Sequence, residues 1–451
     1  MSEYNNIKKE SLQPTLWHHY TSMKEVVEKG SKVIVSGNGA IIKDLEGKEY
    51  IDGLSMLWVV NVGHNRREII EAMKEQMDLI GYASLFGGYS NAPAILAASK
   101  LKEIAPAGLN RVFFVSGGSE AVETAIKMSR QYFQIKGQGG RYKIIARKEA
   151  YHGVTLGALS ATGIRVYRQP FEPLVPGFHH VPAPYCYRCE FNKEPGSCNL
   201  ECAEAIAQAI EWEGPKTVAA VILEPVMNAL GAIIPPEGYF RRVQEITRQY
   251  GVLLIIDEVV CAFGRLGAMF GSEIFNIKPD MIVLAKGLTS GYAPLGAVLV
   301  KEELGQAFDD YMFIHGLTFG GHTLSTTATL KNIEVIQSNG LAQQSREMGS
   351  YLIQGLQTLR KYRTVGDIRG MGLLTAIEYV ADKGSKKKIP ANARFAFRVE
   401  QLAWDRGLYL CRASVDKTYV APPLVVSKEQ INRIIDILDE SIGLAEKEYL
   451  G

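Results

Sequence analysis

Two short apolar runs, each followed by a charged residue, constrain the fold of this chain most strongly. They span residues 252–256 and 281–285. Both are rich in branched residues and lack alternation of apolar and polar positions, which is typical of strands buried on both faces of a parallel sheet covered by helices. Asp257 follows the first run and Lys286 follows the second. Ligands of open α/β sheets bind beyond the carboxyl ends of the strands, so we expect both side chains in one crevice.

An acid and an amine at such an edge indicate a site for pyridoxal 5′-phosphate (PLP). The amine of Lys286 would hold the aldehyde as a Schiff base, and the carboxylate of Asp257 would keep the pyridine nitrogen protonated. A lysine with this task must lose its proton near neutral pH, which requires partial desolvation or a nearby positive charge. In the alternative, Asp257 caps the next element and Lys286 is a solvated lysine at a strand end. The motifs described below favour the cofactor site.

Predicted strands and helices alternate between residues 65 and 330, which indicates a mostly parallel sheet with helices on both faces. Besides the two apolar runs, strands are predicted at 112–115, 143–146, 218–223 and 294–301, and helices at 66–80, 91–104 and 237–250. Residues 32–52 predict a β-meander, because they alternate and turn at glycines. We expect an α/β fold with a large domain at 65–330.

The remainder of the chain predicts a smaller α+β domain built from both chain ends, residues 1–64 and 331–451. After residue 330 the pattern predicts a helix at 341–361, one alternating strand in GDIRGMGLLTAIEYV, a helix at 391–406, two short strands in GLYLCR and TYVAPP, and a final helix at 427–446. Changes in apolar periodicity separate these elements.

The turn from Ser116 to Ser119, SGGS, joins a predicted strand to a helix. Glycines let the backbone approach an anion closely, and a helix N-terminus offers N–H groups and the positive end of the helix dipole. Gly118 and Ser119 are therefore candidate phosphate ligands. Taken alone, the turn favours a plain N-cap, with Glu120 and Glu123 balancing the helix dipole.

Three further side chains are candidates by position. Tyr151 follows a predicted strand, where an aromatic ring can stack on a planar cofactor or pack in the core. Glu224 is an acid at the carboxyl end of strand 218–223. Arg412 lies on a loop between two short strands, where it can clamp a substrate carboxylate or remain a surface arginine.

Composition narrows the function. Hydrophobic residues make up 47% of the 451 positions and charged residues 22%, with a net charge of +2, which is ordinary for a globular enzyme and offers no basic stripe for nucleic acid. No window is long and apolar enough for a membrane span or a signal peptide, so we expect a cytoplasmic protein. Four cysteines, Cys186, Cys189, Cys198 and Cys202, are spaced as in a small zinc loop. Reduced thiols in a surface excursion are the alternative, and we assign no metal site.

Together the motifs resemble the class III aminotransferases of PLP fold type I, and among them the ω-amino acid:pyruvate group. The resemblance extends nearly end to end through LWHH, LWVVNVGHN, SGGSEAVETA, YHG, LLIIDEVVCAFGR, LAKGLTSGYAPLG, HGLTFGGH and VAPPL. The block from Asp257 to Lys286 is its most specific part. The resemblance implies PLP as cofactor and an obligate homodimer, with a tetramer as the alternative assembly and the active sites at the subunit interface.

The resemblance also implies a role for each candidate residue. Lys286 would form the internal aldimine and carry the proton between the substrate Cα and the cofactor, while Asp257 would pair with the pyridine nitrogen. Tyr151 and Val259 would cover the two ring faces, Gly118 and Ser119 would bind the phosphate together with Thr318 of the other subunit, and Glu224 would support the site. Trp58, Phe86 (from the other subunit), Tyr151 and Arg412 would shape the substrate pocket.

The expected function is a ping-pong transamination in which an amine or ω-amino acid gives its nitrogen to pyruvate, forming alanine. The nearest alternative is a 2-oxoglutarate-dependent enzyme of the ornithine or γ-aminobutyrate type, which must bind two acceptor carboxylates. An aminomutase and a non-catalytic protein of the same fold are weaker alternatives. The identity of the amine donor stays open.

Overall fold

A seven-stranded sheet forms the centre of the computed structural model, which describes residues 2–410 and 415–450. Its order is β4-β10-β9-β8-β7-β5-β6. The strands are β4 (Leu109–Val115), β5 (Lys143–Arg147), β6 (Phe178–Val181), β7 (Val218–Leu223), β8 (Leu253–Asp257), β9 (Met281–Leu284) and β10 (Gly296–Lys301). Strands β6, β5, β7, β8 and β9 run parallel, and β10 is antiparallel to both of its neighbours. The sheet is therefore mostly parallel, as predicted.

Both faces of this sheet are buried, which explains the continuous apolar runs. In β8, Leu253 and Ile255 pack into one hydrophobic cluster, whereas Leu254 and Ile256 pack into another on the opposite face. Each residue of β8 is buried. A strand that buries every second side chain on each face has no polar positions to alternate with.

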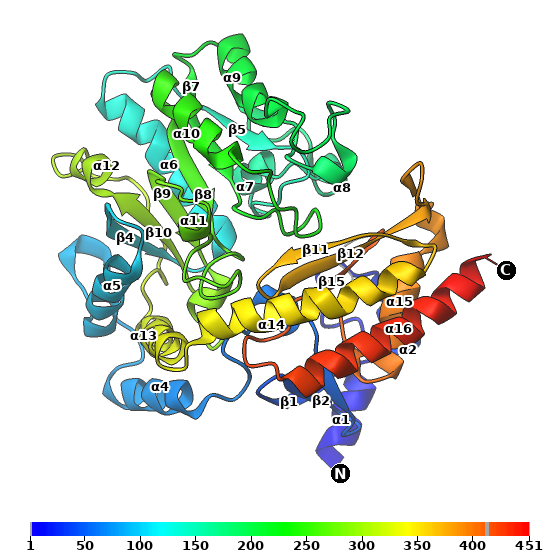
Figure 1. Cartoon of the computed structure of the whole chain (residues 1–451). Coiled ribbons are helices and arrows are strands. Elements are labelled where there is room, and N and C mark those ends of the chain that lie inside the picture. Colours follow the sequence, from blue (N-terminus) through cyan, green and yellow to red (C-terminus); the bar gives the residue numbers. More distant parts are fainter. Residues whose placement is uncertain (1, 411–414, 451) are drawn as a thin grey trace.

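Helices cover the two faces and the edge of the sheet (Figure 1). Helix α6 (Gly118–Ile135) contacts β7, β8, β9 and β10, and α9 (Glu201–Glu213) and α10 (Tyr239–Tyr250) pack together on the opposite face. Helix α5 (Ala92–Ile104) packs against β4, and α13 (Thr323–Ser338) packs against both α5 and α4 (Arg67–Leu79). Shorter helices are α7 (Leu156–Ala161), α8 (Arg165–Arg168), α11 (Gly271–Ile274) and α12 (Glu302–Gln306). The helices do not cover the carboxyl ends of β8 and β9, where a cavity lies.

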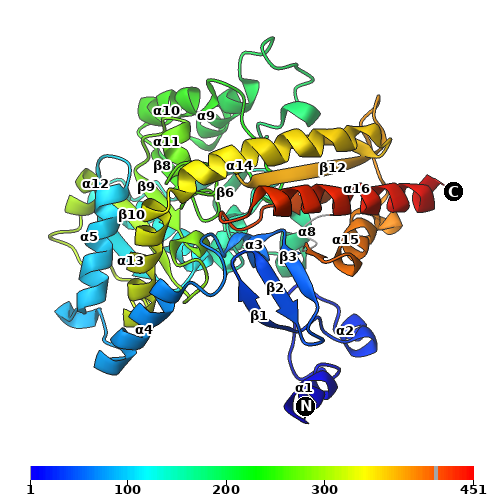
Figure 2. The ribbon, with the colours of Figure 1, turned by 60° about the horizontal axis from the view of Figure 1, so that its bottom comes forward.

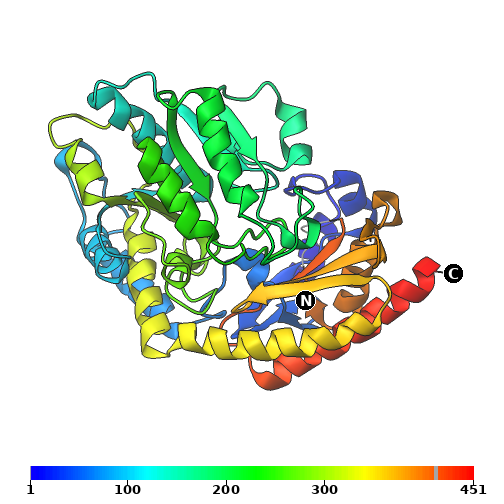
Figure 3. The ribbon, with the colours of Figure 1, turned by 45° about the horizontal axis from the view of Figure 1, so that its top comes forward.

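The two chain ends meet in two smaller sheets. One has the order β1 (Ile34–Asn38), β2 (Ile41–Asp44), β3 (Glu49–Asp52) and β14 (Leu408–Tyr409), so a C-terminal strand completes the N-terminal meander. The other contains β11 (Val365–Met371), β12 (Leu374–Asp382), β13 (Lys387–Lys388) and β15 (Lys417–Val420). Helices α14 (Leu341–Leu356) and α16 (Lys428–Leu450) lie side by side along this second sheet, as Figures 2 and 3 show. Helix α15 (Phe395–Asp405) packs against α16, and α1 (Ser2–Glu10) and α2 (Met23–Lys29) lie near the N-terminus.

The structure corrects three details of the predicted elements. The segment GDIRGMGLLTAIEYV forms two strands, β11 and β12, because Gly372 has φ +55° and turns the chain between them. The predicted helix 341–361 ends at Leu356 and continues as a 3-10 helix, Gln357–Lys361. The helix predicted from residue 391 begins at Phe395. In the described part of the chain, no helix is both long and apolar enough to cross a bilayer.

Candidate active site

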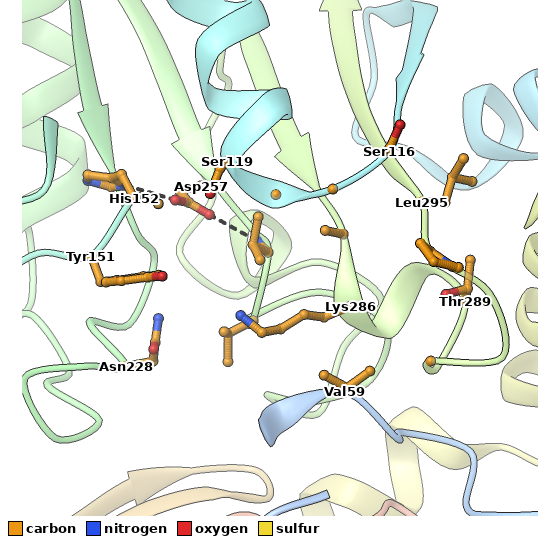
Figure 4. Close-up of a pocket in the computed structure, with 18 of the residues that line it drawn as sticks. Val59, Ser116, Ser119, Tyr151, His152, Asn228, Asp257, Lys286, Thr289 and Leu295 are labelled. Atoms are coloured by element: carbon orange, nitrogen blue, oxygen red, sulfur yellow. Dashed lines mark hydrogen bonds and ion pairs between the residues drawn. The ribbon is translucent and has the colours of Figure 1, made fainter. Parts of the chain in front are cut away.

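A cavity of about 390 Å³ opens at the carboxyl ends of β8 and β9 (Figure 4). Six side chains or glycines expected at the cofactor line it: Gly118, Ser119, Tyr151, Asp257, Val259 and Lys286. They come from the segments that follow β4, β5, β8 and β9. The parallel strands thus bring residues separated by 168 positions (286 − 118) to one edge of the sheet.

Lys286 lies two residues beyond the end of β9 and begins a short 3-10 helix, Lys286–Leu288. Its φ of +47° is unusual for a residue with a side chain and turns the lysine into the cavity. Burial lowers the pKa of the Lys286 amine, while the charges of Asp257 and Glu224 act in the opposite direction. The lowered pKa favours the neutral amine that Schiff-base chemistry requires.

Asp257 ends β8 and is buried, with both carboxylate oxygens held. Oδ1 accepts the backbone N–H of Val259 at 3.0 Å, and Oδ2 lies 2.7 Å from Nδ1 of His152. Figure 4 shows the Asp257 carboxylate beside the His152 ring, with the Lys286 side chain below it. The sequence reasoning missed His152 as a site residue. Its place beside Tyr151, directly after a strand that ends at the same edge, was the available signal.

The turn before α6 has the features of an anion site. The helix begins at Gly118, and a Cβ added there would lie 3.3 Å from the Cγ1 atom of Val259, so the backbone approaches the cavity wall closely. The Ser119 hydroxyl oxygen accepts the N–H of Val154 at 3.1 Å. Glu120 turns back to accept the N–H of Ser116 at 2.7 Å, which satisfies one donor of the turn. The N-terminus of α6 therefore points its positive dipole end at the cavity.

Tyr151 lines the cavity directly, whereas Glu224 contacts a residue that lines it. The ring of Tyr151 lines it and meets Tyr167 edge-on at 6.1 Å, and burial followed by the neighbouring Tyr20 raises the pKa of its hydroxyl. Glu224 is fully buried behind the wall, where it accepts the N–H of Asn228 at 3.0 Å and its side-chain amide at 2.5 Å. Burial raises the pKa of Glu224. Asn228 lines the cavity, so Glu224 acts on it through this amide.

Three of the expected residues, Trp58, Phe86 and Thr318, are not among the residues that line the cavity of the single chain. Trp58 is buried against Tyr419 with ring centroids 5.3 Å apart, and its neighbour Val59 lines the cavity instead. Phe86 and Thr318 lie on the exposed surface, where Phe86 packs on Gly316. Arg412 lies outside the described residues.

The cysteine-rich segment forms a separate feature. Cys186, Cys189, Cys198 and Cys202 surround a cavity of about 20 Å³, and all four are free thiols. Within residues 2–410 and 415–450, no three histidine, cysteine or acidic side chains are placed to hold a metal ion. The segment is fastened to β12 through Glu378, which accepts hydrogen bonds from Tyr185 and from Arg188.

Comparison with known proteins places this site in a family. The class-III aminotransferase model matches residues 24–442, and the chain belongs to this family. A probable aminotransferase of Mycobacterium tuberculosis is 44% identical over 443 residues, covering 96% of this chain and 94% of the relative. The crystal structure of an (S)-enantioselective omega-transaminase from Thermomicrobium roseum superposes with a TM-score of 0.92 at 39% identity, covering 99% of each chain. The protein is a transaminase of PLP fold type I.

The names of other relatives differ in donor and acceptor. A putrescine–pyruvate aminotransferase of Pseudomonas aeruginosa is 34% identical over 425 residues, covering 93% of each protein. A diaminobutyrate–2-oxoglutarate transaminase of Halomonas elongata is 37% identical over 424 residues, covering 91% of this chain and 90% of the relative. Membership of the family therefore leaves the substrates open.

Class III aminotransferases depend on PLP, and the cavity fits this cofactor. It presents an amine with a lowered pKa, an aspartate held by His152, and the N-terminus of α6 with Gly118 close to the opposite wall. These groups match the aldehyde, the pyridine nitrogen and the phosphate of PLP in chemical type.

Proposed function

We propose that the protein transfers an amino group from an amine or ω-amino acid to pyruvate, giving alanine, in a ping-pong reaction. The observation that carries the proposal is the convergence of Lys286, Asp257 and the N-terminus of α6 on one cavity. When bound, PLP supplies the electron sink that makes the substrate Cα acidic. The chain supplies the anchor, the proton carrier and the pocket.

The geometry supports the following roles. Lys286 would hold the cofactor through its amine, and the same amine would take the proton from the substrate Cα. Asp257, oriented by His152, holds a proton on the pyridine nitrogen. Gly118 and Ser119 would bind the phosphate, and Tyr151 and Val259 would pack against the ring, since all four line the cavity. Glu224 orients Asn228 at the cavity wall.

We propose that two copies of the chain complete each active site. Phe86 is 53% exposed and Phe319 is 61% exposed, and they belong to neighbouring segments of one apolar surface, in which the Tyr82 hydroxyl donates to the Thr318 carbonyl at 2.6 Å. Phe86 and Thr318 of one subunit would then reach the site of the other, as Trp58 and Arg412 shape it from within the subunit. Sedimentation velocity of wild type and of Phe319→Asp tests this, since a dimer through this surface should weaken in the variant.

Pyruvate is preferred over 2-oxoglutarate because the cavity has few cations. Lys286 is the only lysine or arginine among the described residues that line it. A dicarboxylate acceptor needs a second positive group beside Arg412, since an unpaired buried carboxylate is costly. The putrescine–pyruvate relative supports this acceptor, and the diaminobutyrate–2-oxoglutarate relative supports the alternative.

Steady-state kinetics with both acceptors tests the proposal. We expect parallel double-reciprocal plots with pyruvate as acceptor and alanine as product. Intersecting plots would contradict the two-stage reaction, and glutamate formed from 2-oxoglutarate at a higher kcat/KM would shift the assignment to the alternative group.

We also propose that the chain forms a large and a small domain. Residues 65–330 would form the large domain, and residues 1–64 and 331–451 the small one. The parallel pairing of β14 with β3, through Leu408 opposite Ile51, supports the joining of the chain ends.

A further inference from the structure

The segment before Val59 has an unusual backbone. Three of its residues have positive φ without being glycine: Ser55 at +50°, Met56 at +60° and Trp58 at +57°. Met56 combines its φ with a ψ of −60°. Side-chain-bearing residues rarely adopt these angles, and such conformations persist only where surrounding contacts enforce them. This turn comprises residues 54–58. The contacts that hold it in its unusual conformation therefore indicate its role.

Asp52 supplies the central contact. Its Oδ1 accepts the N–H of Met56 at 2.9 Å and of Leu54 at 3.2 Å, and its Oδ2 lies 3.0 Å from the same Met56 N–H. The carboxylate is completely buried, and His64 closes it from the other side with Nε2 2.8 Å from Oδ2. One buried acid thus binds the N–H of the most strained residue.

Groups from distant parts of the chain hold the remaining atoms of the turn. The Ser55 hydroxyl donates to the Ala421 carbonyl at 2.7 Å and accepts from the Arg265 guanidinium at 2.8 Å. The Tyr409 hydroxyl donates to the Met56 carbonyl at 2.9 Å. The turn is therefore clamped between the N-terminal meander, the loop after β8 and the C-terminal strands.

The turn determines where its last residue, Trp58, and the following residue, Val59, lie relative to the cavity. Val59 lines the cavity and packs against Gly291 on its wall; Figure 4 shows Val59 opposite Lys286. The Trp58 ring rests on Tyr419, whose hydroxyl donates to the Ala229 carbonyl beside the cavity-lining Asn228. A change in the turn would move this wall without touching Lys286 or Asp257.

We propose that Asp52, oriented by His64, is a positioning residue that selects amine donors by size, because it holds the strained turn and through it Val59 on the cavity wall and the buried Trp58 next to it. This inference rests on the proposed transaminase function. It assigns no contact between Asp52 and the substrate. Loss of the carboxylate should let the turn relax, so that the wall yields to bulkier donors while the acceptor half-reaction is unchanged.

The variant Asp52→Asn tests this, with Asp44→Asn as the matched control. Asp44 is also a buried acid of the N-terminal sheet, where it accepts the Lys48 N–H and the Tyr50 hydroxyl, away from the turn. We expect the ratio of kcat/KM for 1-phenylethylamine over 2-aminobutane to rise about 10-fold in Asp52→Asn. The change should reside in the KM of the bulky donor, with the KM of pyruvate unchanged. Asp44→Asn should leave the ratio at the wild-type value.

A double-mutant comparison separates positioning from general damage. If Asp52 acts through Trp58, Asp52→Asn should no longer change the donor ratio when Trp58 is replaced by alanine. An equal change in both backgrounds, or an equal change in Asp44→Asn, would overturn the inference. Should Asp52→Asn fold poorly, His64→Gln keeps the carboxylate and should produce a smaller rise in the same ratio, and an unchanged ratio there would contradict the role of His64.

Hydrogen–deuterium exchange of the cofactor-free protein tests the positioning without catalysis. Peptides covering residues 53–62 should exchange faster in Asp52→Asn than in wild type or Asp44→Asn, because the Met56 N–H then faces one neutral amide oxygen in place of two carboxylate oxygens. Unchanged exchange would overturn the inference even if transamination is confirmed, whereas faster exchange in a protein without transaminase activity would refute only the proposed function.

Discussion

The floor and the wall of the cavity are built in different ways. Every group of the floor follows a strand of the central sheet: Gly118 after β4, Tyr151 after β5, Asp257 at the end of β8 and Lys286 after β9. The wall around Val59 depends instead on contacts between the chain ends, such as Ser55 with Ala421, which are 366 residues apart. The floor can therefore set the chemistry while the wall varies the substrate, because a change in one leaves the supports of the other intact.

Removing the lysine of the floor should have the largest effect. Lys286→Ala should lower kcat by more than about 1000-fold, since both the covalent anchor and the proton carrier are lost. Lys301→Ala is the control, because Lys301 ends β10 with its side chain 43% exposed near Asp280. Initial rates of alanine formation measure both. Comparable rates in the two variants would show that Lys286 takes no part in catalysis.

Neutralising the acid of the floor should have the next largest effect. Asp257→Asn should lower kcat by about 100-fold, because an amide does not stabilise a protonated pyridine nitrogen. Asp280→Asn is a matched control at the opposite end of the strands, where the carboxylate accepts the Leu254 N–H at 2.9 Å. It should cost about 1 kcal/mol of stability and leave kcat within about 2-fold of wild type. A similar loss of kcat in both variants would show a structural role for Asp257.

A change in the wall should affect stability and selectivity more than rate. The Arg265 guanidinium is fully buried and donates to Leu373 and Pro422 carbonyls, to Ser55 and to Asn61. Burial lowers its pKa to about 9, so part of the stabilisation is offset by desolvation. Arg265→Met should lower the free energy of unfolding by about 3 kcal/mol and alter the donor ratio.

Arg141→Met provides the control for the wall. Arg141 donates to the carbonyls of Val218, Tyr250 and Gly251 at the amino ends of the strands. Denaturant titration should show a loss of stability in both arginine variants. If the ratio of kcat/KM for 1-phenylethylamine over 2-aminobutane changed in neither variant, the contacts of the wall would have no influence on donor selectivity.

The smallest expected effect concerns stability and pH. Because burial lowers the pKa of Lys286 in the folded state, the unfolded chain binds this proton more tightly, and the charged amine destabilises the fold at neutral pH. The cofactor-free Lys286→Met protein should therefore be more stable than wild type at pH 7. The difference should shrink as pH rises through the folded pKa toward the ordinary lysine value of about 10.4. Thermal melts across this range measure it, and a constant difference would contradict the assigned cause.

The floor was predictable because its signals are local. An apolar run followed by a charge places Asp257 and Lys286 without knowledge of any distant contact, and strand 218–223 agrees with β7 at both ends. Local patterns also misled: the apolar positions continue across Gly372, which concealed the turn between β11 and β12. The antiparallel direction of β10 has no local signal, since a buried strand has the same pattern in either direction.

The wall was not predictable for a physical reason. Asp52 precedes a glycine like many turn residues, and its importance appears only once Met56 is seen at φ +60° with its N–H on that carboxylate. His152 likewise gains its role from a partner 105 residues away. The roles predicted for Phe86 and Thr318 require a second subunit, so both roles stay predictions, and in the single chain the two residues are exposed.

The most direct test of the central claim is the visible absorption spectrum of the PLP-loaded protein during each half of the reaction. We predict an absorption band that disappears when an amine is added and returns when pyruvate follows, with Asp52→Asn changing which amines remove it but not the return with pyruvate. A protein whose band persists with every amine, or that shows no band after loading with PLP, would contradict the assignment of Lys286 and Asp257 as the chemical floor of the site.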